Sequence, residues 1–184
     1  MKKSLTLLVF GLVLTACTSR IDTDIKSVYE SKSQIPLNAA SVLVKYDFNP
    51  TVKTSGTDHL FSRSLTQGLE RWVNARLRPA GQFGVAQVTV RDASILELPD
   101  SQTPEKFEGI LDVIISLIDQ RGVILAQAET KVKRARIAPR NISDQERHDL
   151  TNVVVTEVIN DFDKQMEEAI LKMTSIIPIN PKTF

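Results

Sequence analysis

Apolar residues recur at two spacings along the chain, and each spacing predicts one kind of element. In residues 41–48 (SVLVKYDF) they occupy alternate positions in β-rich company, which is typical of a strand. From about residue 58 to 78 they recur every three or four positions until Pro79 and Gly81, which favours an amphipathic helix that ends there. We expect this helix to face the core with Phe61, Leu65, Leu69, Trp72, Val73 and Leu77.

Three further strands follow in the pattern. In residues 85–98 the apolar phase changes near Arg91, which predicts a β-bulge or bend. Residues 107–139 read as a hairpin whose turn is DQRG at 119–122. The stretch 110–118 is apolar at both phases, which favours a central strand.

The last predicted element is a long helix. Residues Ser143 to Glu146 (SDQE) fit a capping box, in which the serine hydroxyl and the glutamate carboxylate satisfy free backbone N–H groups. Pro178 ends the helix, because proline cannot continue it. Its expected apolar side carries Leu150, Val153, Val154, Val158, Phe162, Met166, Ile170 and Met173.

The order of elements predicts the fold class. It reads β-α-β-β-β-α, and two amphipathic helices need a common surface to bury against. We therefore predict an α+β fold: a two-layer sandwich in which a mostly antiparallel four-stranded sheet is covered by two helices.

The N-terminus has the form of a secretory signal. Lys2 and Lys3 precede an apolar core at residues 5–14 that is about ten residues long, too short to span a bilayer, which takes about twenty. The motif LTAC at residues 14–17 then resembles the lipobox of bacterial lipoproteins. That resemblance implies cleavage before Cys17 and acylation of Cys17, with palmitate-type chains anchoring the protein to a membrane.

The same resemblance gives the expected localisation. Thr18 stands where aspartate would retain an enterobacterial lipoprotein in the inner membrane. We therefore expect a protein of the cell envelope at the periplasmic face of the outer membrane. Two or three acyl chains on Cys17 would hold it there, since stable attachment takes about two.

These features divide the chain. We predict a signal peptide at 1–16, the lipidated cysteine with a flexible tether at 17–40, a periplasmic domain at 41–177 and a C-terminal tail at 178–184. The apolar residues of 25–29 leave open a short docking turn within the tether. Loss of Lys2 and Lys3 leaves 21 basic and 22 acidic residues, a formal charge of −1. Such a chain is a poor partner for nucleic acid.

Candidate catalytic and metal-binding chemistry is sparse. His59 and His148 lie far apart without metal-ligand spacing, and we expect both at the surface near helix starts. Asp161 and Asp163 could form a carboxylate pair, but residues two apart point to different sides of a helix, so we expect a solvated face. We predict no catalytic residues, no metal site and no cofactor, and hence no enzyme; a hydrolase is the least favoured alternative.

One basic run stands out. Five cations occur within ten residues, late in the predicted return strand and the following loop, at Lys131, Lys133, Arg134, Arg136 and Arg140. Arginine matches phosphate geometry, so these residues are candidate contacts to anionic lipid. The alternative is an edge strand whose charges prevent unwanted strand pairing. By alternation, the two lysines share one side of the strand and Arg134 and Arg136 the other.

The order of elements also resembles two families of small envelope lipoproteins. These are the lipopolysaccharide-assembly lipoprotein and the auxiliary lipoproteins of ABC-type lipid transport, over about residues 41–173. The resemblance implies a non-catalytic accessory or interaction module whose partner is an outer-membrane barrel or a lipid-transport complex. The alternative is a lipid- or glycolipid-binding protein.

Overall fold

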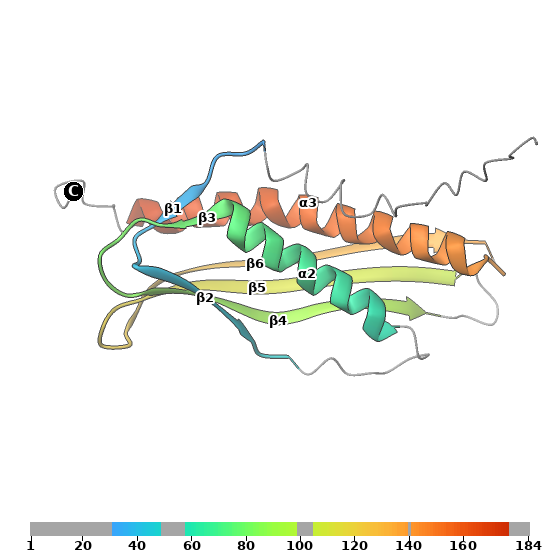
Figure 1. The fold of residues 1–184 in the computed structure, drawn as a ribbon, viewed down its shortest axis with the longest axis horizontal. Helices are drawn as coiled ribbons and strands as arrows, with labels where there is room; N and C mark the ends of the chain where they lie inside the picture. Colours follow the sequence, from blue (N-terminus) through green and yellow to red (C-terminus); the bar gives the residue numbers. More distant parts are fainter. Residues whose placement is uncertain (1–30, 49–57, 99–104, 140, 177–184) are drawn as a thin grey trace, which may run out of the picture.

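The computed structural model describes residues 31–48, 58–98, 105–139 and 141–176. Its strands and helices are drawn in Figure 1. They are β1 (Ile35–Leu37), β2 (Ser41–Tyr46), α2 (Asp58–Arg76), β3 (Leu77–Pro79), β4 (Val85–Leu98), β5 (Glu105–Ile118), β6 (Ile124–Ala138) and α3 (Asp144–Ile176).

The main sheet has four strands in the order β2-β4-β5-β6. β2 runs parallel to β4 across the α2 crossover, whereas β4, β5 and β6 are antiparallel neighbours. Both helices lie on one face of this sheet, α2 over β4 and α3 over β5 and β6 (Figure 1). The predicted two-layer α+β sandwich is confirmed.

A β-bulge in β4 keeps the apolar residues of that strand on one face. The register with β5 shifts between Val90 and Asp92, where the sequence predicts a change of phase. Because of this extra residue, Val88 and Val90 before the bulge and Ala93 and Ile95 after it are all buried against the helices. The hairpin turn also forms as predicted, with the amide of Gly122 donating to the carbonyl of Asp119.

The folded domain begins before residue 41, so the predicted tether boundary at residue 40 is wrong. Ile35 and Leu37 in β1 are buried in the core, and β1 pairs in parallel with β3. This pairing also ends the first helix at Arg76, two residues before the predicted end. Leu77 is buried in the core as the first residue of β3, and Pro79 has no N–H to donate to a helical hydrogen bond.

The long helix begins with the predicted capping box. The backbone N–H of Ser143 donates to Glu146 Oε2 at 2.8 Å, and Glu146 N donates to the serine hydroxyl at 3.3 Å. One predicted core residue is wrong: Val153 is 44% exposed, whereas Val154 and Val158 are buried. The reason is that α3 packs closely on β5 at Gly109, where an added Cβ would lie 2.8 Å from Val154 Cγ1. This close approach places Val154 on the side of α3 that faces the sheet.

Within the described residues, no helix combines the length and the apolar character needed to cross a bilayer. Cys17, Arg140, the apolar residues at 25–29 and the predicted tail at 178–184 lie outside the described residues.

Candidate functional site

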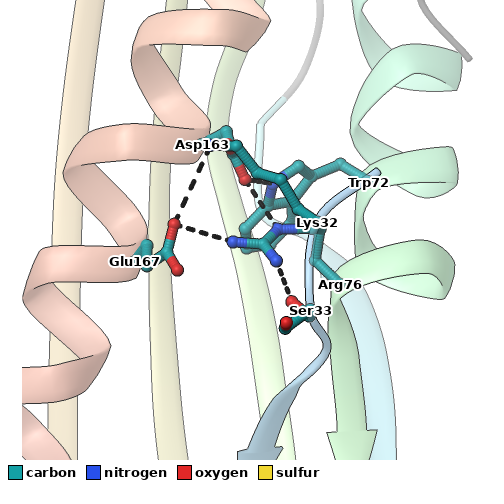
Figure 2. A network of polar contacts seen from close by, with 6 residues as sticks. All are labelled: Lys32, Ser33, Trp72, Arg76, Asp163 and Glu167. Carbon is teal, nitrogen blue, oxygen red and sulfur yellow. Dashed lines mark hydrogen bonds and ion pairs between the residues drawn. The ribbon is translucent and has the colours of Figure 1, made fainter. Parts of the chain in front are cut away.

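A buried polar cluster joins both helices to the chain just before β1. It consists of two residues of the N-terminal segment, two of α2 and two of α3, and we call it the clasp (Figure 2): Lys32, Ser33, Trp72, Arg76, Asp163 and Glu167. Charged groups inside a protein are stable only when they are paired and hydrogen-bonded. The role of the clasp therefore depends on which groups its charged side chains contact.

Asp163 lies at the centre of the clasp. Its Oδ1 accepts hydrogen bonds of 2.8 Å from the Trp72 indole Nε1 and from Arg76 Nε, and its Oδ2 accepts one from Lys32 Nζ. The side chain of Asp163 is 1% exposed and that of Arg76 is 0% exposed. The Trp72 ring also packs edge-on against Phe162, with centroids 4.8 Å apart.

Arg76 extends the clasp in two more directions. Its Nη2 forms an ion pair with Glu167 Oε2 at 2.8 Å, and its Nη1 donates to the backbone carbonyl of Ser33. One guanidinium thus holds α3 and the segment that leads into β1 at the same time. Lys32 also pairs with Asp163, and its Nζ lies 3.9 Å from Glu167 Oε2, so residues 32–33 are fixed to both helices.

The environment of Asp163 favours its charged form. Burial by itself would raise the pKa of Asp163, but the hydrogen bonds from Lys32, Trp72 and Arg76 outweigh it and hold the pKa below the usual range of an aspartate. A general base works best with a pKa near the operating pH. The clasp is therefore suited to holding the N-terminal segment and poorly suited to proton transfer.

The expectation of a solvated face is wrong for Asp163. Asp161 and Asp163 do point to different sides of α3, as their spacing predicts, but only Asp161 lies near the surface. The sequence signal was present: Asp163 follows Ile159 by four residues and precedes Met166 by three, which puts it in phase with the buried stripe. Arg76, at i+7 from Leu69, is in phase on α2.

The basic run is divided between the two faces of β6, as the alternation predicts. Lys131 and Lys133 lie on the face away from the helices. There Lys131 Nζ is 3.3 Å from Asp112 Oδ2, and Lys133 Nζ is 2.7 Å from Glu108 Oε1. Both carboxylates are largely covered by these and neighbouring cationic side chains.

The two arginines lie on the helix side of β6. Arg134 pairs with Asp161, and Arg136 Nε donates to Glu157 Oε2 at 3.0 Å. They line an open groove of about 490 Å³ between β6 and α3, together with Ala135, Asn160 and Lys164. With three cations and two carboxylates, the groove carries a formal charge of only +1. β6 is also an edge strand of the sheet. This position is the one expected if the charges of the basic run prevent unwanted strand pairing.

The described residues contain no group of three or more histidine, cysteine, aspartate or glutamate side chains arranged to hold a metal ion. His148 is partly exposed on α3, and its Nδ1 lies 3.1 Å from the side-chain amide of Asn152. The side chain of His59 is outside the described set.

No protein-family model matches the chain, and no curated protein matches its sequence. Among solved structures, a minor lipoprotein from Acinetobacter baumannii is similar with a TM-score of 0.43 at 12% identity, over 74% of this chain and 98% of that one. A protein from Xanthomonas campestris gives 0.36 at 10% identity, over 74% and 86%. A chain of the PelC dodecamer from Paraburkholderia phytofirmans gives 0.33 at 15% identity, over 73% and 94%. At these scores the likeness is partial, and the function has to be inferred from this chain's own residues.

Proposed function

We propose that this chain is a lipoprotein of the bacterial envelope, anchored by acyl chains on Cys17, whose α+β domain is a non-catalytic interaction module. Its partner is an outer-membrane barrel or a lipid-transport complex, and it works at the periplasmic face of the outer membrane. Thr18, directly after Cys17, supports the assignment to the outer membrane.

The observation that carries the proposal is the position of the clasp relative to the lipobox. Only residues 18–31 separate Cys17 from Lys32, which is already fixed to the domain. A chain of this length reaches at most about 50 Å when fully extended. An anchor at Cys17 therefore keeps the folded domain within one domain length of the membrane, where a membrane-protein partner can be contacted.

The arrangement of the two layers supports an interaction role. The inner face of the sheet is filled by the protein's own helices, with Leu65, Trp72 and Phe162 fully buried there. Among the described elements, none packs on the outer face of the sheet or along the β6 edge, which leaves these surfaces for another molecule. The clasp adds rigidity, because it joins three segments that are distant in sequence.

A second candidate function is binding of lipid or glycolipid. The groove at Arg134 and Arg136 favours it, since two half-exposed guanidinium groups face one opening of about 490 Å³. An anionic headgroup would have to compete there with Glu157 and Asp161, which already pair with these arginines. This competition makes the interaction module our preferred function.

Copurification distinguishes the two candidates. The lipidated full chain is purified from membranes in mild detergent, and what remains bound is identified by mass spectrometry after crosslinking. A stoichiometric membrane protein is the expected result. A protein that carries only phospholipid or glycolipid and no protein partner would overturn the interaction module in favour of the second candidate.

The Cys17→Ser chain is the matched control. Proteins captured equally by the acylated and the unacylated chain in the same detergent bind the domain itself. Proteins captured only by the acylated chain bind the acyl chains or the detergent around them.

A further inference from the structure

Four large apolar side chains are exposed at one end of the molecule. Phe83, in the loop before β4, is 65% exposed, and Val123, Ile124 and Leu125, at the turn between β5 and β6, are 50%, 53% and 49% exposed. We call them the apolar tip; the β5–β6 turn lies at the left-hand end of Figure 1. Single exposed apolar residues are common on proteins, whereas a group at one extremity marks an interaction surface.

The two loops of the apolar tip are held against each other. Gly84, next to Phe83, lies so close to β5 that an added Cβ would be 2.4 Å from the carbonyl oxygen of Ile118. Ile118 in turn pairs with Ile124 across the hairpin. The turn is braced by Asp119, whose Oδ1 accepts from the amide of Val123 at 2.8 Å. The two loops of the apolar tip are therefore held at fixed positions beside each other.

The N-terminal segment enters the domain at the clasp, which lies a little closer to the tip end of α3 than to its other end. From the clasp the chain runs through β1 toward the loop that carries Phe83, where the amide of Ala40 donates to the carbonyl of Gly84 at 3.1 Å. Along α3, Asp163 stands about 20 Å from the helix end near the tip and about 29 Å from the opposite end, at 1.5 Å per residue. Residues 18–31 can bridge the distance from a bilayer that the tip touches, since they span at most about 50 Å.

We infer that the apolar tip inserts into the outer part of the same leaflet that holds the acyl chains of Cys17. The inference rests on the proposed lipid anchor and adds the orientation of the domain. Aromatic and aliphatic side chains such as Phe83 and Ile124 are the kind that bury at the boundary of headgroups and acyl chains. Because the acyl chains already supply attachment, the second contact restricts how the domain tilts.

This orientation has a consequence for the groove. Arg134 lies ten residues along β6 from Ile124, which is about 33 Å at 3.3 Å per residue. With the tip in the leaflet, the groove and the far half of the β6 edge project away from the headgroups. They are then placed to face a protein in the periplasm.

Site-specific fluorescence tests the inference in the lipidated chain. Cys17 is the only cysteine in the sequence, and acylation uses its thiol, so one introduced cysteine gives one labelling site. Val123→Cys carries a polarity-sensitive dye in vesicles of phosphatidylethanolamine and phosphatidylglycerol, with and without lipids that bear a quencher in the acyl chain. Ile137→Cys is the matched control, because Ile137 is also exposed and apolar but lies at the opposite end of β6.

We expect the dye at 123 to shift to the blue on reconstitution and to be quenched several-fold more than the dye at 137. Phe83→Cys should repeat the result, which guards against a local effect of one label. Equal quenching at 123 and 137 in protein whose mass includes the acyl chains would overturn the inference and leave the anchor intact. Blue-shifted emission at 123 that the lipid quencher does not reach would also overturn it, because a protein then covers the tip. If the mass of the purified protein does not include acyl chains, the proposed lipid anchor itself is overturned.

Discussion

Arg76 Nε donates a 2.8 Å hydrogen bond to Asp163 Oδ1 in a site from which water is almost excluded, with the two side chains 0% and 1% exposed. The two residues come from different helices and are 87 positions apart in the sequence. Around this pair, Lys32 and Ser33 fix the segment that follows the proposed lipid anchor. The clasp therefore joins the segment that leads from the proposed lipid anchor to the folded domain.

Replacing Asp163 with asparagine should strongly destabilise the domain. The change removes the negative charge that compensates the buried guanidinium of Arg76, and leaves Glu167 as its remaining carboxylate partner. Breaking a buried ion pair from one side costs about 3–5 kcal/mol of unfolding free energy. Urea unfolding of Asp163→Asn against the parent protein measures this loss.

Asp161→Asn is the control for that experiment. It makes the same chemical change two residues away, at a carboxylate whose partner Arg134 is half exposed. Surface ion pairs contribute about 0–1 kcal/mol, so this variant should unfold nearly like the parent protein. An equal loss in both variants would contradict the special role of the clasp.

The stabilisation by Asp163 should depend on pH in one direction. Its pKa is lowered in the folded protein, so the unfolded chain binds the proton more readily as the pH falls. The contribution is present above the unfolded value of about 3.9 and is lost as the pH falls through the lower folded value. The stability difference between the parent protein and Asp163→Asn should therefore shrink between about pH 5 and pH 3. A difference that grows on acidification would show that Asp163 is protonated in the folded protein.

Lys32→Met should loosen the N-terminal segment without unfolding the domain. Lys32 is 35% exposed, and its ion pairs with Asp163 and Glu167 hold the segment together with the hydrogen bond from Arg76 to Ser33. We expect a loss of about 1 kcal/mol in global stability. Amide hydrogen exchange in residues 35–40 should accelerate measurably. Lys45→Met, which removes an exposed lysine 3.9 Å from Asp47, should leave that exchange unchanged.

The double variant Arg134→Ala/Arg136→Ala should not weaken binding to anionic vesicles. Both guanidinium groups are already paired with carboxylates of α3 and lie far along β6 from the apolar tip. Flotation of the mature chain with Cys17→Ser measures the contribution of the domain alone. The matching pair Lys131→Ala/Lys133→Ala removes the same charge from the opposite face. A selective loss in the arginine variant would favour the lipid-binding function.

Most of the fold follows from local pattern. The capping box at Ser143, the bulge near Arg91 and the turn at 119–122 act within a few residues, and each was predicted at its observed place. Helical spacing predicted both helices, although α2 ends two residues before its predicted end. The short pair of β1 and β3 was not predicted. Three-residue strands carry too few positions to show an alternation, and they form here because Leu37 and Leu77 complete the core.

The clasp was not predicted, although Arg76 and Asp163 are in phase with the buried stripes of their helices. A charged residue on an apolar stripe gives no sign of its partner, because Asp163 meets Arg76 only after α2 and α3 have packed side by side. Lys32 was assigned to a tether for the same reason. The positions of Lys131, Lys133, Arg134 and Arg136 on two faces follow from strand alternation, but their carboxylate partners on β5 and α3 do not.

The most direct test of the central claim is the intact mass and the membrane fractionation of the mature protein, compared with Cys17→Ser. We expect the parent chain to begin at Cys17, to carry the mass of two or three acyl chains, and to stay with the outer membrane after a high-salt wash. Cys17→Ser should lack that mass and leave the membrane. A Cys17→Ser chain that remains bound as firmly as the parent would contradict the lipid anchor.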